Sequence, residues 1–284
     1  MKTSTQLKAL IRNMSKLKGL EAEVILRHYM LEKLLEKISL SSYKDNFILK
    51  GGMLIAAMVG MESRSTMDMD ATIKGFDLSK EEIETVFSII LNIEINDDVS
   101  MQLKSVEDIR EEAEYPGVRV AIEAILDKTK QILKFDITTG DIITPKEIRF
   151  DYKLMFEDRT LNIKAYNLET VLAEKLETII IRGVTNTRMR DFYDVYVLTK
   201  LYSDNIDKSV FSSALKNTAK KRETISQFKT SNALAYVSLK ESGVMIDLWK
   251  RYQSKYSYAV DISWQKIIES IQLLLSMISK DILQ

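Results

Sequence analysis

The sequence predicts an α+β protein in which a mixed sheet flanked by helices is followed by a mainly helical C-terminal domain. Between residues 99 and 137 apolar residues alternate with polar ones, which is the pattern of half-buried strands. From residue 168 onward apolar residues recur at three- and four-residue spacing, which is the pattern of amphipathic helices. We therefore expect a mixed α/β domain with N-terminal helices over residues 1–165 and a helical domain over residues 166–284.

Composition narrows the chemistry that the chain can perform. Its 284 residues, of which 45% are apolar and 29% charged, can bury one large core or two modest ones. The absence of cysteine and the single histidine, His28, argue against thiolate or histidine metal sites and against a serine triad. Any chemistry must therefore use carboxylates, Lys, Arg, hydroxyls and backbone amides.

Charge and hydropathy restrict the partners. Forty-one basic residues balance forty-one acidic ones, so a polyanionic partner would have to be held by a local patch. No apolar run approaches the ~18 residues of a membrane span, and the N-terminus has no signal-peptide core. We expect a cytoplasmic protein with no membrane contact.

The N-terminal spacing predicts two amphipathic helices between Ser4 and about Ile38, hinged near Gly19. His28 lies on or beside the apolar stripe of the second helix, so we expect a packed histidine and not a catalytic one. A short strand is then expected over residues 47–49, and a helix that begins at the following Gly-Gly is expected over residues 53–58.

The rest of the first domain follows from strand, turn and cap signals. A strand is expected from Thr66 to Ile73, and Ser79 is expected to cap a helix that runs to about Leu91. Three further strands are expected around residues 99–103, 118–122 and 132–137, with turns at Pro116-Gly117 and Thr139-Gly140-Asp141 and a connector from about Phe150 to Ala165.

In the second domain, Asn167 is expected to cap a helix from Leu168 to Arg182 that ends at Gly183. A second helix is expected to start at Arg188. The later features are a basic segment over Lys216 to Lys229 and a last amphipathic run from Trp264 to Leu283.

The strand that ends at Ile73 carries two acids, Asp68 and Asp70, on one face, because successive side chains of a strand point to opposite faces. At ~4 Å and an effective dielectric of ~20 the two carboxylates would repel by roughly 4 kcal/mol, which a divalent cation would relieve. Gly51 and Gly52 allow a phosphate to approach the start of the next helix, and Asp136 on a neighbouring strand is a candidate third ligand. Hard oxygen ligands of this kind suit magnesium.

A second cluster is expected in the helical half. Lys175 interrupts an apolar helix, and Asp191 and Asp194 share a face of the next helix with Arg190 nearby. The residues alone favour slightly a salt bridge between two helices over a functional cluster.

Five successive motifs resemble those of the AbiEii/AbiGii toxin family over residues 47–198, and their order and spacing match. They are Lys50-Gly-Gly-Met-Leu, Arg64-Ser-Thr-Met-Asp-Met-Asp, Phe135-Asp-Ile-Thr-Thr-Gly-Asp, Leu172-Ala-Glu-Lys-Leu-Glu and Arg188-Met-Arg-Asp-Phe-Tyr-Asp. The members of this family are nucleotidyltransferase-like toxins of abortive-infection systems, which defend bacteria against phages. The resemblance therefore implies a nucleotidyltransferase-like sheet in the first domain.

The resemblance also implies roles for particular residues. Asp68, Asp70, Lys175 and Asp191 would be catalytic, and the metal, Mg²⁺ or Mn²⁺, would be held by Asp68 and Asp70 together with Asp136. Nucleotide binding would fall to the glycine turn, the residues before the acids and two basic side chains, namely Gly51, Gly52, Arg64, Ser65, Lys175 and Arg190. Asp194 can be purely structural, and a groove between the two halves would bring metal, triphosphate and acceptor together.

The implied reaction is transfer of a nucleoside monophosphate from a nucleoside triphosphate to RNA, in particular to the tRNA 3′ end. The basic segment from Lys216 to Lys229 is a candidate contact with the acceptor, although a solvated helix surface is the commoner reading. The resemblance implies a winged-helix antitoxin as partner, which need not touch the toxin. Three alternatives stay open: a small-molecule (antibiotic-type) nucleotidyltransferase, a nucleotide-binding interaction protein without catalysis, and a phosphotransferase that moves a terminal phosphate.

Overall fold

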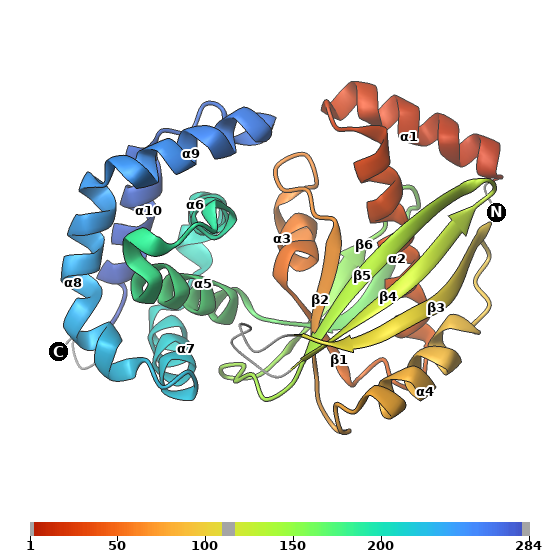
Figure 1. Ribbon diagram of the computed structural model, residues 1–284, viewed down its shortest axis with the longest axis horizontal. Coiled ribbons are helices and arrows are strands. Elements are labelled where there is room, and N and C mark those ends of the chain that lie inside the picture. Colours follow the sequence, from red (N-terminus) through yellow and green to blue (C-terminus); the bar gives the residue numbers. More distant parts are fainter. Residues whose placement is uncertain (1–2, 110–116, 280–284) are drawn as a thin grey trace. The chain divides into compact units, whose positions relative to one another are not determined.

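The computed structural model describes residues 3–109 and 117–279, and the chain divides into two compact units (Figure 1). The first unit comprises Met1–Asp141 and Ile148–Ala165, and the second comprises Ile142–Glu147 and Tyr166–Gln284. The sequence also places a division after residue 165. That the two parts are separately folding domains stays a prediction.

The first unit is built on one mixed sheet, as predicted, with the strand order β3-β4-β5-β2-β1-β7-β6 among the described residues. The β2–β5 and β1–β7 pairs are parallel and the other neighbours are antiparallel. The strands are β1 (Phe47–Lys50), β2 (Asp68–Ile73), β3 (Val99–Asp108), β4 (Gly117–Leu126), β5 (Thr129–Thr138), β6 (Ile148–Lys153) and β7 (Thr160–Ala165).

The helices of this unit are α1 (Ser4–Lys18), α2 (Ala22–Leu40), α3 (Gly51–Val59) and α4 (Lys80–Leu91). The predicted hinge near Gly19 is confirmed, because Gly19 ends α1 in the left-handed conformation with a φ of 65°. The predicted cap of α4 is also confirmed, since the Ser79 hydroxyl accepts a hydrogen bond from the Glu82 amide.

The apolar face of the sheet forms the core of the unit. The rings of Phe47 on β1 and Phe135 on β5 both pack against Phe87 of α4, with centroids 6.1 and 5.7 Å away. Met69 of β2 lies on the same face and is fully buried. Its neighbours Asp68 and Asp70 therefore point to the opposite face, as predicted from the period of a strand.

Two predictions for this unit are wrong. The expected connector from about Phe150 to Ala165 contains β6 and β7, which pair in an antiparallel hairpin. Because β6 lies at the edge of the sheet and buries only Tyr152, its apolar signal in the sequence is weak. The strand expected from Thr66 begins at Asp68, and Pro116 of one expected turn lies outside the described residues.

The second unit is helical, as predicted. Asn167 caps α5 by accepting the Thr170 amide, and Gly183 ends this helix with a φ of 50°. The α-helices are α5 (Leu168–Arg182), α6 (Met189–Tyr202), α7 (Lys208–Lys221), α8 (Ile225–Glu241), α9 (Gly243–Lys255) and α10 (Trp264–Ser276). Short 3-10 turns are η1 (Gly183–Thr185), η2 (Ser203–Asn205) and η3 (Ser257–Ala259). The last amphipathic run is expected from Trp264 to Leu283, but α10 ends at Ser276, and Leu283 lies outside the described residues.

The lone histidine is packed, as predicted. His28 on α2 is buried, and its Nε2 lies 3.0 Å from the Tyr152 hydroxyl of β6. Burial lowers the pKa of His28 to about 4, so the imidazole is neutral at physiological pH. Across residues 3–109 and 117–279 no helix combines the length and apolarity needed to cross a bilayer.

Candidate active site

A row of charged side chains crosses the polar face of the sheet. In strand register, Asp70 of β2 stands opposite Asp136 of the parallel strand β5 on one side and opposite Lys50 of β1 on the other. Arg119 of β4 stands opposite Asp136 and ends the row. Asp68 lies on the same face, two residues before Asp70 along β2. The two adjacent carboxylates at the centre are thus flanked by one cation on each side.

Asp70 and Asp68, the two acids of β2, differ in the interactions that their carboxylates make. Burial and the neighbouring Asp136 raise the pKa of Asp70 above its usual value, although Lys50 and the Gly52 amide oppose this. That amide donates a weak hydrogen bond of 3.4 Å to Asp70 Oδ2. Asp68 is half-exposed, and within the described residues its carboxylate has no hydrogen-bond or ion-pair partner. Among the described residues, Lys50 attracts Asp70 and Arg119 attracts both Asp68 and Asp70 electrostatically, but no close ion pair neutralises either carboxylate.

Asp136, the expected third metal ligand, is held by Arg119. The guanidinium donates two hydrogen bonds, from Nε to Oδ1 and from Nη2 to Oδ2, each 2.7 Å long. A bidentate pair of this kind already neutralises the carboxylate. Asp136 would have to leave Arg119, or share it, to bind a metal, and its role as a ligand stays a prediction.

The sequence interpretation missed a buried ion pair beside this row. Lys50 Nζ donates to Asp141 Oδ2 at 2.5 Å and to the Thr138 hydroxyl at 2.7 Å. Thr72 and Thr138 also donate hydroxyl hydrogens to Asp141. Burial alone would raise the pKa of Asp141, but Lys50 and the two hydroxyls lower it, so the carboxylate stays ionised. This pair fixes the end of β5 to β1, next to the charged row.

The Gly51-Gly52 turn packs directly on these residues. Gly51 has a φ of +65°, and a Cβ built on it would lie 2.1 Å from Asp70 Oδ2. A Cβ on Gly52 would lie 2.6 Å from the Thr66 hydroxyl and 3.2 Å from Arg64 Nη2. Any larger residue at either position would displace the side chains beneath it. The two glycines are therefore required by the close approach of the backbone to the acid and to Arg64.

The side chain of Arg64 packs against this turn, and the Ser65 carbonyl accepts a hydrogen bond from it. The Arg64 side chain is buried, and its Nη1 donates to the Ser65 carbonyl at 2.6 Å. Its guanidinium lies against the Gly52 backbone, which places a fixed positive charge behind the start of α3. The side chain of the N-cap residue, Lys50, makes no hydrogen bond to that helix start, and the Gly52 amide there makes only the weak bond to Asp70. Phosphate binding by Arg64 or Ser65 stays a prediction.

The second unit contains the other predicted cluster. Lys175 of α5 donates to Asp191 Oδ1 and lies as close to Asp194 Oδ2, both at 2.8 Å. The two aspartates are buried and the Lys175 side chain is 14% exposed, and Arg188 reaches the other oxygen of Asp191 at 3.0 Å. Burial opposes the charge of Lys175, but the two aspartates raise its pKa, so the ammonium is retained. The structure thus brings together the predicted residues as a buried salt bridge that includes Asp194.

Two other basic residues are engaged elsewhere. Arg190, a predicted nucleotide ligand, donates to the Tyr256 hydroxyl at 2.8 Å. Arg222, from the basic segment, is buried against Glu177 of α5 at 2.5 Å. Arg222 therefore stabilises the helix packing and is removed from the surface that the sequence offered to an acceptor.

The residues fit a divalent cation only in part. Over the described part of the chain, no three His, Cys, Asp or Glu side chains are grouped so that they could hold a metal ion by themselves. Magnesium, however, is usually bound by one or two carboxylates together with substrate phosphates and water. Asp68 and Asp70 provide two carboxylates on one face of β2, which is the number that this smaller requirement asks for, and their binding of a metal stays a prediction.

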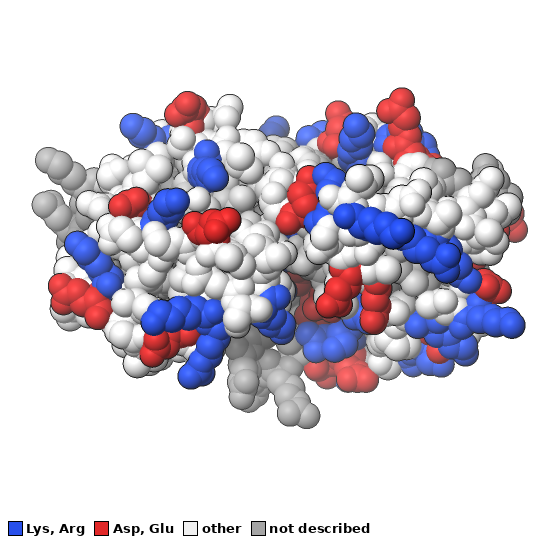
Figure 2. All heavy atoms as spheres, turned by 90° about the horizontal axis from the view of Figure 1, so that it is seen from above, with Lys and Arg blue, Asp and Glu red and all other residues white. Residues whose placement is uncertain are grey.

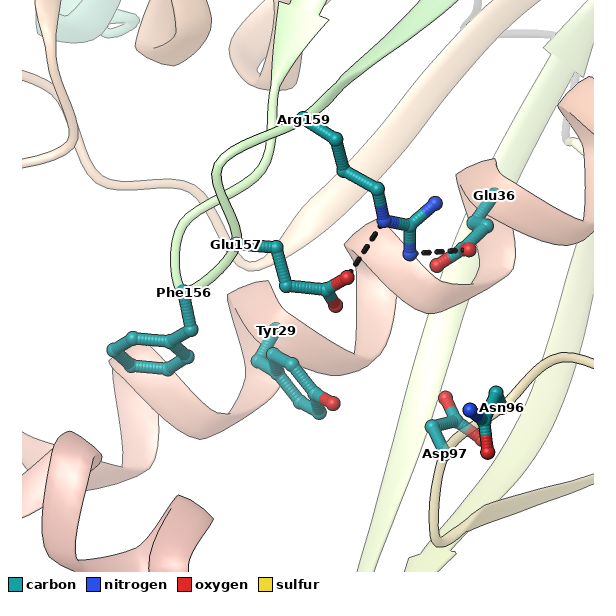
Figure 3. Close-up of a pocket in the computed structure, with 7 residues that line it drawn as sticks. All are labelled: Tyr29, Glu36, Asn96, Asp97, Phe156, Glu157 and Arg159. Atoms are coloured by element: carbon teal, nitrogen blue, oxygen red, sulfur yellow. Dashed lines mark hydrogen bonds and ion pairs between the residues drawn. The ribbon is translucent and has the colours of Figure 1, made fainter. Parts of the chain in front are cut away.

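A cavity of about 330 Å³ lies elsewhere in the first unit (Figure 3). It is lined by Tyr29, Glu36, Asn96, Asp97, Phe156, Glu157 and Arg159. Arg159 donates to Glu157 at 2.6 Å and to Glu36 at 2.5 Å, and Lys33 binds the same two acids. Because its cations are already neutralised and Asp97 adds a further negative charge, this cavity does not suit a triphosphate.

Comparison with known proteins gives one family and one fold. The family model described as "Nucleotidyl transferase AbiEii toxin, Type IV TA system" matches residues 33–270. No curated protein matches the chain. JHP933 from Helicobacter pylori aligns with a TM-score of 0.50 and 15% identity, covering 92% of this chain and 96% of that one. Another Helicobacter pylori structure, described as a candidate nucleotidyltransferase, gives 0.49 and 16% over 90% and 96%. At these identities the likeness concerns the fold alone.

Replacing Gly51 by alanine should displace the Asp70 side chain, against which the Gly51 backbone packs. Gly19 offers a matched control because it has the same φ of +65° but nothing within 4 Å of a built Cβ. We expect Gly19→Ala to lower the free energy of unfolding by about 1 kcal/mol, the cost of a left-handed alanine. Gly51→Ala should cost about 1–3 kcal/mol more, because its methyl group overlaps Asp70.

Urea unfolding followed by circular dichroism measures both costs. In a double-mutant cycle, Asp70→Gly should remove the extra cost of Gly51→Ala, since it removes the atoms that the methyl group meets. Equal costs for Gly19→Ala and Gly51→Ala would contradict the close approach.

Lys175→Met should destabilise the second unit by about 3 kcal/mol, because it leaves two buried carboxylates without their ammonium. Both tryptophans, Trp249 and Trp264, lie in this unit, so their fluorescence during urea unfolding reports the change. Lys250→Met, which breaks an exposed pair with Asp247 in the same unit, is the control and should leave the transition unchanged. Similar transitions for the two variants would refute the buried role.

Proposed function

Since its residues 33–270 match the family model, the chain belongs to the AbiEii nucleotidyl transferase toxin family, and we propose that it transfers a nucleoside monophosphate from a nucleoside triphosphate to RNA. The predicted family is thereby confirmed, and the chain is a nucleotidyltransferase-type toxin of a toxin–antitoxin system. The acceptor that we propose is the 3′ end of a tRNA. Its modification would block translation and arrest growth.

The observation that carries the proposal is the acidic pair beside an uncapped helix start. Asp68 and Asp70 share one face of β2, and the Gly51 backbone touches Asp70 where α3 begins. A helix start favours phosphate because its amides are unsatisfied and its dipole is positive. Acids that can hold a cation therefore lie directly beside a place where phosphate can bind.

Asp68 and Asp70 are the residues that would hold Mg²⁺ or Mn²⁺. Such an ion supplies charge neutralisation of the triphosphate and polarises the attacking hydroxyl. The Gly52 amide and its successors in α3 would hold phosphate oxygens, with Arg64 as the charge behind them. Lys50 and Asp141 would keep β1 and β5 in place around the acids.

The transfer itself balances as follows. The acceptor hydroxyl oxygen forms a bond to the α-phosphorus of the triphosphate, and the bond from that phosphorus to the bridging oxygen breaks. Pyrophosphate leaves with the electron pair, and the hydroxyl proton goes to solvent. The chain's own contribution is to orient the triphosphate and to hold its charge, which is the main requirement of phosphoryl chemistry.

Lys175 and Asp191 are proposed as a second part of the catalytic machinery on the strength of the family resemblance. Within the second unit the ammonium is held by two aspartates, so a contact with triphosphate would have to be made without losing those bonds. A change of Lys175 therefore tests stability as well as catalysis, and the functional test below uses Asp68, which is half-exposed.

The family description includes a toxin–antitoxin system, which implies an antitoxin as partner. We propose a winged-helix protein that neutralises the toxin without binding it directly. This partner would bind DNA or counteract the effect of the toxin instead of covering its active site.

The test is to incubate the full chain with total RNA, Mg²⁺ or Mn²⁺ and each nucleoside triphosphate labelled at the α- or the γ-phosphate. We expect label in RNA from an α-labelled nucleotide only. Asp68→Asn should reduce labelling by about 100-fold or more, since several kcal/mol of charge stabilisation would be lost. Asp98→Asn, a change of an exposed acid in the loop before β3, is the matched control and should label as the wild type does.

Three results would contradict the proposal. Label from the γ-phosphate would indicate a phosphotransferase. Label in a small molecule and not in RNA would indicate a different acceptor. Undiminished labelling by Asp68→Asn would show that the Asp68 carboxylate is not needed for the reaction.

A further inference from the structure

Two tyrosine rings lie stacked and half-buried in the second unit, where α9 meets η3. The rings of Tyr256 and Tyr258 are 5.3 Å apart with an angle of 21° between their planes. Two buried tyrosines support them: Tyr252 packs on Tyr256 and Tyr193 packs on Tyr258, each with a centroid distance of 4.7 Å. The stacked pair is therefore a rigid aromatic surface that remains partly open to solvent.

Hydrogen bonds fix this surface in place. The hydroxyl groups of Tyr252 and Tyr258 lie 2.9 Å apart. Gln253 Nε2 donates to the carbonyls of Ala259 and Ile262 at 3.2 and 3.0 Å, which ties η3 to α9. Because the Tyr258 hydroxyl and the backbone that follows Tyr258 are held, binding of a stacked ligand would lose little conformational entropy at the site.

Cations surround the ring of Tyr256. Arg190 of α6 donates to the Tyr256 hydroxyl, and its guanidinium carbon lies 5.4 Å from the ring centroid. Lys255 Nζ lies 5.5 Å from the same centroid. Arg251 precedes Lys255 by four residues on α9, so the two exposed side chains share one side of the helix. Two cations thus lie over the Tyr256 ring.

This local positive charge matters because the molecule as a whole has no excess of positive charge that would attract a polyanion. Lys and Arg side chains are interspersed with Asp and Glu over the face drawn in Figure 2, and the net formal charge is +0. A polyanion therefore needs a patch where the cations are not cancelled by acids. On α9 the one acid, Asp247, pairs with Lys250 and lies four residues before Arg251, so this helix carries three cations, Lys250, Arg251 and Lys255, against a single acid.

The aromatic surface is also close in the chain to the buried cluster. Arg190 contacts Tyr256, and the next residue of α6, Asp191, binds Lys175. One turn of α6 therefore connects the tyrosine pair to a residue of the proposed catalytic machinery within the same unit.

We propose that Tyr256, backed by Tyr258, is a stacking site for an unpaired base near the end of an RNA acceptor, with Arg190, Arg251 and Lys255 against its phosphates. Unpaired bases are commonly recognised by stacking on aromatic rings and on arginine, with basic side chains along the backbone. This inference rests on the proposed function for its substrate, and it replaces the segment from Lys216 to Lys229 as the acceptor contact. It also gives Arg190 a role toward the acceptor and not toward the nucleotide.

The test is the binding of a 5′-fluorescein-labelled, single-stranded RNA 12-mer to the full chain, measured by fluorescence anisotropy without any nucleotide. Tyr256→Ala should weaken binding by about 10-fold or more, which is the loss expected for one stacked base. Tyr256→Phe keeps the ring and should bind within about 2-fold of the wild type. Tyr236→Ala is the matched control, because Tyr236 lies half-buried on α8 of the same unit and should not affect binding.

Charge is tested with Arg251→Glu, which should weaken RNA binding and reduce its dependence on salt. Circular dichroism of each variant shows that it is folded. Unchanged binding by Tyr256→Ala, an equal loss with Tyr256→Phe, or equal affinity for duplex RNA of the same sequence would overturn the proposal.

The same measurement separates this inference from the proposed reaction. Asp68→Asn should lose RNA labelling and keep RNA binding, because Asp68 is not one of the residues that form the proposed stacking site. If the wild type fails to label RNA but its binding still depends on Tyr256, the stacking site stands and the reaction is refuted. If labelling occurs and Tyr256→Ala binds normally, the reaction stands and the stacking site is refuted.

Discussion

Asp70 and Asp136 stand side by side on the neighbouring parallel strands β2 and β5. The arrangement of the charged residues on the polar face of the sheet depends on how these two negative charges are neutralised. Asp136 is neutralised by two hydrogen bonds from Arg119, whereas Asp70 has a weak bond from the Gly52 amide and a more distant cation, Lys50. The carboxylate of Asp68, on the same face, makes no hydrogen bond or ion pair with the described residues, although Arg119 attracts it electrostatically. Among the described residues, Asp68 and Asp70 are therefore acids of this face without a close ion pair, and they lie beside the start of α3.

The glycine turn depends on this arrangement and also maintains it. Gly51 can touch Asp70 only because it lacks a Cβ and adopts a positive φ, and Gly52 likewise leaves room for Arg64. A serine in this turn would bring a hydroxyl toward a phosphate, but the space at both positions is already filled by the acid and by Arg64. Backbone amides are thus the groups that this chain can offer there.

Local patterns predicted one part of the site, and non-local pairing decided the rest. The shared face of Asp68 and Asp70 follows from the period of a strand, and the salt bridge of Lys175 with Asp191 was one of two readings of their helices. The partners Arg119, Lys50 and Asp141 could not be predicted, because they meet the acids only through the order β4-β5-β2-β1. The contacts of Arg190 and Arg222 could not be predicted for a similar reason, since a basic residue in a sequence does not reveal the Tyr256 hydroxyl or the Glu177 carboxylate beside it.

The central claim is that Asp68 and Asp70 hold a divalent cation together with the triphosphate. Equilibrium dialysis of nucleoside triphosphate analogues that carry a methylene between the α- and β-phosphorus, with and without Mn²⁺, tests it most directly. The account predicts that Mn²⁺ tightens binding of at least one analogue to the wild-type chain, and that Asp68→Asn and Asp70→Asn each abolish this effect of the metal. A metal effect of the same size in both variants would contradict the account.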